Sequence, residues 1–372
     1  MSNTAFFISR TSPAKKGSIV PKLVLALGLL ATPAGTSAGS VTVIPTPNDG
    51  TVPDAQIDDR GVIHLVYLAG EDVCYVKSSD EGKTFSAPIL VNTEQATAFG
   101  AKYRGPDLVL GKAGRIHVIW YSNAYQRKLP KEKWGVFYAH LEYSGTAFTP
   151  ARNLNRRPSD NYSLAADGAG KVAVFWTADG AFVNTSDDDG ETFSEATKID
   201  QADPCECCAT RAFFSPGGTL YLFYREKAQN LRDMHLIVRA DGQTAFSKQR
   251  VSGAPWLIDA CPMTGVYLAG GNGKNLVAGW ETKGRINFAR LDHAGHPLSP
   301  GEIKVSEKGK YPVALTAPDG TTLVAWKTGE TLDWRMMDRK GRPQGSPGSA
   351  PSESANRPAG VVTKAGHFLL FP

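Results

Sequence analysis

The fold is decided by the stretch Ser78-Ser79-Asp80-Glu81-Gly82-Lys83-Thr84-Phe85 and by its second copy, Ser186-Asp187-Asp188-Asp189-Gly190-Glu191-Thr192-Phe193. Both read Ser-x-Asp-x-Gly-x-Thr-Phe, and each lies between two short runs with β character. Ser and Asp side chains hydrogen-bond to nearby backbone groups, the glycine takes a positive-φ corner, and the phenylalanine packs back against the sheet. The sequence therefore predicts the same hairpin twice.

This octapeptide resembles the Asp box, or BNR repeat, of sialidases and other Asp-box β-propellers. In that family the box lies in the turn between the third and fourth strands of a blade, and it fastens the turn rather than taking part in catalysis. The resemblance implies a structural role for the motif residues of both copies, which are Ser78, Asp80, Gly82, Thr84, Phe85, Ser186, Asp188, Gly190, Thr192 and Phe193.

A strand that ends in an aromatic residue recurs along the chain. The instances are Ile63 to Tyr67, Ile116 to Trp120, Val172 to Trp176, Leu220 to Tyr224, Leu276 to Trp280, Thr322 to Trp326 and His367 to Phe371. Successive closing aromatics are 53, 56, 48, 56, 46 and 45 residues apart. A period of about 50 residues made of four short strands, without a helical pattern between them, is typical of a β-propeller. The sequence therefore predicts an all-β fold of four-stranded antiparallel blades.

The number of blades follows from how the ring closes. The seventh unit stops at Pro372 after two strands, and the run from Ser40 to Ile44 is the one strand candidate left unassigned. Pairing of this N-terminal strand with the C-terminal blade would close the ring and remove its sheet edges. We therefore expect seven blades. Six blades, the number in known sialidases of this kind, is the alternative, and a β-sandwich, which would not require a fixed period, is a further one.

The N-terminal segment has the features of a secretory signal. Residues 1–38 carry a basic leader, an apolar core from Leu23 to Ala31, and small residues ending at Ala38. The core is too short to span a bilayer, so we expect export to the periplasm or the outside, with cleavage near Ala38 or Ala34. Residues 39–372 are expected to form one propeller domain and a monomer. The formal net charge is +5, partly from the leader, and no basic block remains to suggest nucleic-acid binding.

Arginines gather at one end of the predicted ring. The Asp boxes mark the back, so the segments that precede the first strand of each blade, or follow its closing aromatic, mark the front around the channel. These segments contain Arg104, Arg127, Arg211, Arg225, Arg232 and Arg357. Because arginine presents a planar fork that binds carboxylates bidentately, the cluster suits a glycan or another small anionic ligand. The alternative is that the arginines pair with Asp203, Asp233 and Asp259 to hold loops.

The resemblance to sialidases implies specific roles at this front end. Those enzymes place three arginines on the sialic acid carboxylate, and the first lies in a Phe/Tyr-Arg-x-Pro motif that Tyr103-Arg104-Gly105-Pro106 is similar to, except that Gly105 replaces an apolar residue. Arg211 and Arg357 are the candidates for the other two, by position alone. Tyr311 with Glu226 would form the nucleophile pair. The loop where the family has its acid/base Asp contains Glu132 and no Asp, so the acid candidates are Asp233, Asp259 and Glu132.

Four of the five cysteines open two neighbouring units. They are Cys205, Cys207 and Cys208 in one unit and Cys261 in the next, whereas Cys74 lies alone in a strand and is expected to be a buried thiol. In an exported protein the default expectation for the four is two disulfides. A Cys207–Cys208 bridge is the least favoured, because adjacent Cα atoms are only about 3.8 Å apart. The alternative is a thiolate site for Cu or Zn formed by the same four residues.

Together these patterns predict an exported, sialidase-like Asp-box propeller that acts on an acidic sugar. As an enzyme it would hydrolyse a glycosidic bond by the retaining route and need no cofactor. Two alternatives stay open, a non-catalytic propeller that binds a glycan or a protein, and a periplasmic protein with a thiolate metal site. Resemblance in fold alone does not separate them.

Overall fold

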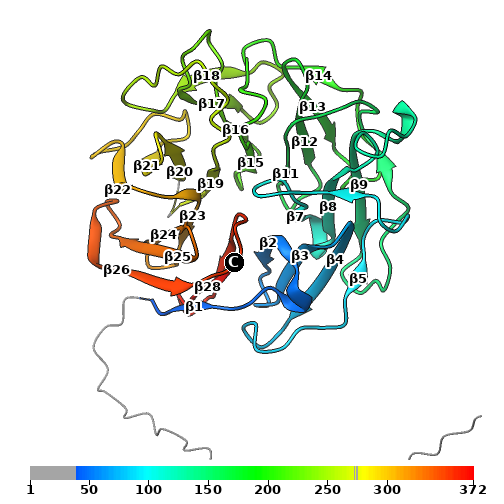
Figure 1. The fold of residues 1–372 in the computed structure, drawn as a ribbon, viewed down its shortest axis with the longest axis horizontal. Coiled ribbons are helices and arrows are strands. Elements are labelled where there is room, and N and C mark those ends of the chain that lie inside the picture. The colour runs from blue at the N-terminus through cyan, green and yellow to red at the C-terminus, as the bar shows by residue number, and fades with distance from the viewer. Residues whose placement is uncertain (1–38, 272, 274) are drawn as a thin grey trace, which may run out of the picture. The chain divides into compact units, whose positions relative to one another are not determined.

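The computed structural model describes residues 39–271, 273 and 275–372, which form a seven-bladed β-propeller around a central channel (Figure 1). The prediction of seven blades is confirmed. The expected signal segment, residues 1–38, lies outside the described residues. In the part of the chain that is described, no helix has the length and apolar character needed to cross a membrane.

Six blades consist of strands that follow one another in the chain, ordered from the channel outward (Figure 1). The first three blades are β2 (Thr51–Ile57), β3 (Ile63–Ala69), β4 (Asp72–Ser78) and β5 (Ile89–Leu90); β7 (Asp107–Leu110), β8 (Ile116–Ser122), β9 (Val136–Leu141) and β10 (Arg152–Asn153), with β6 (Ala98–Phe99) also paired to β8; and β11 (Tyr162–Ala166), β12 (Val172–Thr177), β13 (Ala181–Ser186) and β14 (Thr197–Lys198).

The next three blades repeat this order. They are β15 (Arg211–Phe214), β16 (Leu220–Arg225), β17 (Met234–Arg239) and β18 (Ser247–Arg250); β19 (Val266–Gly270), β20 (Leu276–Thr282), β21 (Arg285–Leu291) and β22 (Ile303–Ser306); and β23 (Lys310–Thr316), β24 (Thr322–Thr328), β25 (Thr331–Met337) and β26 (Pro343–Pro351). Three 3-10 helices lie in loops, η1 (Pro47–Asp49), η2 (Lys112–Gly114) and η3 (Lys131–Lys133).

The seventh blade joins the two ends of the chain. It contains β27 (Ala359–Val362), β28 (Phe368–Phe371) and the N-terminal strand β1 (Val41–Val43), which pairs with β28 as expected. This blade differs from the prediction in having three strands, with β1 parallel to β28. A hairpin would force an antiparallel pair, but no hairpin joins these two strands.

The hydrophobic core lies between neighbouring blades. Every predicted aromatic-ended run is the second strand of its blade, and the seven closing aromatics are at most 4% exposed. Trp120 of the second blade, for example, packs in one cluster with Val66 and Tyr75 of the first. Side chains that alternate along each strand thus fill the gaps on both sides of a blade, and this packing holds the blades together in a ring.

Both Asp boxes lie between the third and fourth strands of their blades, as expected. In the first, the Ser78 hydroxyl donates to Asp80 at 2.7 Å and the Gly82 N–H donates to Ser78 Oγ at 2.9 Å. The Thr84 hydroxyl and N–H both donate to the Asp80 carboxylate, at 2.6 and 2.9 Å, and they lower its pKa to about 2. The second box repeats this network around Asp188, so both copies act as fasteners of a turn.

Candidate functional site

Two loops that are far apart in the sequence meet at the front of the ring. The loop before β7 carries Arg104, and the loop before β27 carries Arg357. The N–H of Lys102 donates to Asn356 Oδ1 at 2.9 Å, and the N–H of Arg357 donates to the Lys102 carbonyl at 2.7 Å. The first and third of the predicted arginines are therefore held in neighbouring loops.

Buried ion pairs tie these loops to the inner strands. Arg211 Nη1 lies 3.5 Å from Asp54 Oδ2 and 3.8 Å from Asp107 Oδ1, while Arg357 Nη2 lies 2.8 Å from Asp107 Oδ1. Burial alone would lower the pKa of Arg211, but the charges of Asp54 and Asp107 outweigh it and raise that pKa. The arginines thus pair with Asp54 and Asp107, and no ion pair joins them to Asp203, Asp233 or Asp259 among the described residues.

Arg104 stands at the more open edge of this group. Its Nη2 lies 3.8 Å from Asp160 Oδ1, with side chains that are 24% and 52% exposed. Burial raises the pKa of Asp160, and the charge of Arg104 opposes that rise. The Nε atoms of Arg104 and Arg357 are buried without a hydrogen-bond partner among the described residues. Buried donors are almost always paired, so these two nitrogens each lack an acceptor that such a donor normally has.

Tyr311 adopts an unusual backbone conformation beside the arginines. Its φ is +53°, at a register shift between Lys310 and Val313 in the pairing of β23 with β24. Positive φ is rare for a bulky residue and is concentrated at functional positions. The Tyr311 ring lies 5.9 Å from that of Tyr103. Burial, followed by the nearby charge of Glu281, raises the pKa of Tyr311 to about 12.

Glu281 is the buried carboxyl group that acts most strongly on Tyr311, and sequence reasoning missed it. It is 5% exposed, and burial raises its pKa to about 7 against the charges of Lys310 and Arg225 and a hydrogen bond from the Gly265 N–H. Its Oε2 has no partner among the described residues. The signal was present in the sequence, since Glu281 directly follows the closing aromatic Trp280, where front-face residues are expected.

The predicted partner of Tyr311 lies elsewhere. Glu226 accepts a hydrogen bond from the Tyr224 hydroxyl and lies 3.1 Å from Lys248 Nζ. No hydrogen bond, ring contact or shared cavity joins Glu226 to Tyr311 among the residues described.

The three predicted acid candidates are also dispersed. The Asp233 carboxylate is buried and accepts hydrogen bonds from Arg250 Nε at 2.8 Å and the Trp256 N–H at 3.0 Å. Asp259 is exposed on the loop before β19, and Glu132 lies on η3 at an outer crevice. None of the three lines the cavity beside Tyr311, and neither does Asp160. Asp160, which sequence reasoning missed, is the carboxyl group that contacts Arg104.

The space between the front arginines is small. Arg211, Arg357, Tyr103 and Tyr311 line a cavity of about 30 Å³. Pockets for small ligands usually have volumes of about 300–1,000 Å³. The Tyr103 hydroxyl donates to the carbonyl of Cys207, so the cysteine-bearing loop contacts one of the residues that line this cavity.

One of the two expected disulfides is present. It joins Cys207 to Cys261 with a Cα–Cα distance of 6.3 Å, and adjacent Cys207 and Cys208 are not bridged. Cys205 and Cys208 are buried free thiols with their Sγ atoms 3.4 Å apart. The hydrogen bond between them holds the pKa of Cys208 below its usual range. Cys74 is also a free thiol, but it is half-buried where the sequence predicted burial.

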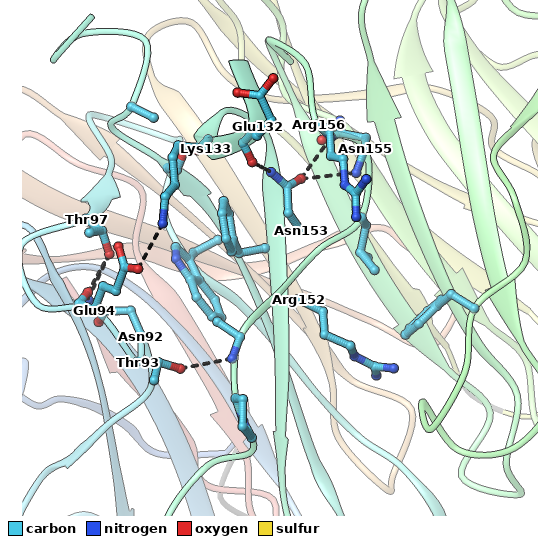
Figure 2. Close-up of a pocket in the computed structure, with 18 of the residues that line it drawn as sticks. Asn92, Thr93, Glu94, Thr97, Glu132, Lys133, Arg152, Asn153, Asn155 and Arg156 are labelled. Carbon is cyan, nitrogen blue, oxygen red and sulfur yellow. Dashed lines mark hydrogen bonds and ion pairs between the residues drawn. The ribbon is translucent and has the colours of Figure 1, made fainter. Parts of the chain in front are cut away.

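A much larger crevice runs along the outer edge of the second blade (Figure 2). Its volume is about 1,080 Å³, and it extends from the end of the first blade past β10 to the second Asp box. Asparagines line it, together with charged residues such as Arg156 and an ion pair of 3.0 Å between Lys133 and Glu94 (Figure 2). Several of these amides hold loops, as Asn153 does by donating to the carbonyl of Glu132 at 3.1 Å.

No protein-family model matches the sequence, and no similar curated protein was found. Solved structures share the fold. A protein of unknown function from Dyadobacter fermentans is 15% identical with a TM-score of 0.54, covering 84% of this chain and 97% of the other. A PL25 ulvan lyase bound to -[GlcA(1-4)Rha3S]- is 9% identical with a TM-score of 0.50, covering 84% and 87%.

A leech intramolecular trans-sialidase complexed with 2,7-anhydro-Neu5Ac is also among the similar structures. It is 11% identical with a TM-score of 0.45, covering 74% of this chain and 64% of that one. The structures with TM-scores of 0.50 and 0.54 share the propeller fold, and identities this low leave the activity to be argued from the site.

Proposed function

We propose that this protein is an exported glycoside hydrolase that acts on a sugar bearing a carboxylate, at the front of the ring. The observation that carries the proposal is that Tyr311, near the charge of Glu281, lines one cavity with Arg357. Arg104 lies over the ring of Tyr103 in the same cavity wall, and the Nε atoms of both arginines are buried without a partner among the described residues. A buried donor without an acceptor is costly, and a ligand carboxylate would satisfy it. Export rests on the signal-like segment of residues 1–38.

Arg104 is the arginine best placed to contact the ligand. Arg211 and Arg357 are already neutralised by Asp54 and Asp107, so their charges mainly fix the geometry of the cluster. Among the described residues, Arg104 has only the half-exposed Asp160 as an ion-pair partner. We therefore assign the main contact with the carboxylate to Arg104, and a second contact to the free Nε of Arg357.

Tyr311 and Glu281 would supply the nucleophile and its base. A tyrosine with a pKa of about 12 is a weak nucleophile unless a nearby base removes its proton. Glu281, with a pKa of about 7, is charged on a large fraction of molecules at neutral pH and can accept that proton. Attack by Tyr311 on the anomeric carbon would give a glycosyl-enzyme intermediate, which water then hydrolyses with retention.

Asp160 would act as the acid. Burial raises its pKa above the usual range, which favours the protonated form needed to protonate a leaving oxygen. It replaces Asp233, Asp259 and Glu132 in this role because it is the carboxyl group that contacts Arg104. The cavity holds about 30 Å³, so a sugar can enter only if the residues around it move, and the loop of Cys207, bonded to Tyr103, is the proposed moving part.

The test is turnover of a fluorogenic sialoside by the purified mature protein. We expect hydrolysis that Arg104→Ala, Tyr311→Phe and Asp160→Asn each reduce by about 100-fold or more. Asp319→Asn, in an exposed turn between β23 and β24, is the matched control and should keep full activity. No turnover by the unmodified protein, or equal turnover by all four variants, would exclude the proposal.

A second function is favoured by one observation, the volume of the outer crevice. At about 1,080 Å³ it could hold a short oligosaccharide without any loop movement. The protein would then be a glycan-binding propeller without catalysis. Glycan binding that Arg156→Ala weakens and Arg104→Ala leaves unchanged, together with no sialoside turnover, would support this function over the first.

A further inference from the structure

The thiols of Cys205 and Cys208 lie beneath the front surface, under the exposed disulfide of the next loop. Cys205 is 4% exposed and Cys208 is 1% exposed, whereas Cys261 is open to solvent. The Sγ of Cys205 lies 3.4 Å from that of Cys208 and 3.6 Å from that of Cys207. Four sulfur atoms therefore form one cluster, in which two belong to thiols and two to a disulfide.

A buried cation is linked to the thiols through one hydroxyl group. Arg225 is 1% exposed, and no carboxylate lies within 4.0 Å of its guanidinium among the residues described. Its Nε donates to Thr264 Oγ1 at 2.9 Å, and the Thr264 hydroxyl donates to Cys208 Sγ at 3.4 Å. The backbone N–H of Cys205 donates to the Arg225 carbonyl at 2.7 Å. The two Nη atoms of Arg225 donate to the backbone carbonyls of Arg232 and Glu281, which satisfy the guanidinium without cancelling its charge. An anionic complex at the thiols would therefore be stabilised by this buried cation.

We propose that Cys205 and Cys208 form a binding site for one Cu(I) ion. Binding replaces the two thiol protons, which are released to solvent, and gives a bis-thiolate complex with a net charge of −1. Arg225 supplies the matching charge of +1, relayed through the Thr264 hydroxyl. Thiolate ligands select soft ions such as Cu(I), and the two free thiols lie with their sulfur atoms 3.4 Å apart.

Two alternatives fit the same residues less well. A structural Zn²⁺ site takes four ligands, and the Cys207–Cys261 disulfide removes two of the four sulfurs. A second disulfide between Cys205 and Cys208 would be neutral, so the buried charge of Arg225 would stabilise it less than it would stabilise a bis-thiolate. The copper site rests on contacts among Cys205, Cys208, Thr264 and Arg225, so copper binding and sialoside turnover are measured separately and can fail separately.

The site is tested with the full mature protein, its disulfide intact, under anaerobic conditions. The protein is titrated with Cu(I) held by bathocuproine disulfonate as competitor, and the metal is counted after desalting. We expect one copper per chain, with sulfur-only ligation in the Cu K-edge spectrum of the unmodified protein. Cys205→Ser and Cys208→Ser should lose the copper, and Cys74→Ser, at the free thiol in β4, should retain it.

Thr264→Val tests the relay without touching a ligand. It removes the hydroxyl between Arg225 and Cys208 at nearly constant volume, so Cu(I) affinity should fall by about tenfold while the stoichiometry stays at one. Thermal melting curves report whether each variant is folded.

Three results would overturn the proposal. The first is copper retained at one per chain when both Cys205 and Cys208 are replaced. The second is a native protein whose only free thiol is Cys74, which would indicate a second disulfide. The third is a K-edge spectrum with nitrogen or oxygen ligands. Because the spectrum and the thiol count use the unmodified protein, they decide the question even if a serine variant does not fold.

Discussion

Replacing Asp107 with asparagine should lower the free energy of unfolding by about 3–5 kcal/mol. The side chain of Asp107 is 3% exposed and lies 2.8 Å from Arg357 Nη2 and 3.8 Å from Arg211 Nη1. Asparagine keeps the shape but removes the charge, so two guanidinium groups lose a buried counter-ion at once. The same change should loosen the contact between blades, because the three residues come from the second, fourth and seventh blades.

Asp160→Asn is the matched control in the same cluster. Its partner Arg104 is 3.8 Å away and its side chain is 52% exposed, so the loss should be less than about 1 kcal/mol. Both variants are measured by urea unfolding at pH 7, followed by tryptophan fluorescence. Equal losses for Asp107→Asn and Asp160→Asn, or no loss for the former, would refute the view that Arg211 and Arg357 are held structurally.

Two further predictions concern pH and the Asp boxes. Burial raises the pKa of Glu281 to about 7 from its ordinary 4.5, so the folded state holds this proton more tightly and stability falls as the pH rises between these values. Glu281→Gln should remove this loss, roughly 3 kcal/mol, when unfolding is compared at pH 4 and pH 8. Gly190→Ala should lower the free energy of unfolding by about 1–3 kcal/mol more than Gly82→Ala does, as measured by melting experiments. At Gly190 the new methyl group would overlap the Tyr138 hydroxyl, whereas at Gly82 it would overlap the flexible end of Ile44.

The fold could be predicted because its signals are local and repeated. Each closing aromatic marks a second strand, and each Asp box carries its own network of hydrogen bonds, as around Asp80. The pairing of β1 with the last blade followed from the need to close the ring. The parallel direction of β1 could not be predicted, because it depends on the path by which the chain reaches the last blade and not on any residue in β1.

The site could be predicted only in part because it depends on contacts between distant residues. Position around the ring was enough to group Arg104, Arg211 and Arg357, but the partners Asp54 and Asp107 lie on inner strands whose register the sequence does not specify. Their negative charges change the cluster from an open clamp to a largely paired network. In the same way, the pairing of Cys207 with Cys261 was one of several arrangements that the spacing allowed.

The most direct test of the front-face site is a crystal structure of the mature protein soaked with an unsaturated sialic acid analogue. The account predicts the sugar carboxylate within hydrogen-bond distance of the Nε atoms of Arg104 and Arg357, with the loop of Cys207 displaced from the Tyr103 hydroxyl. An analogue bound only in the outer crevice of Figure 2, or an empty front cavity at a saturating concentration of the analogue, would contradict it.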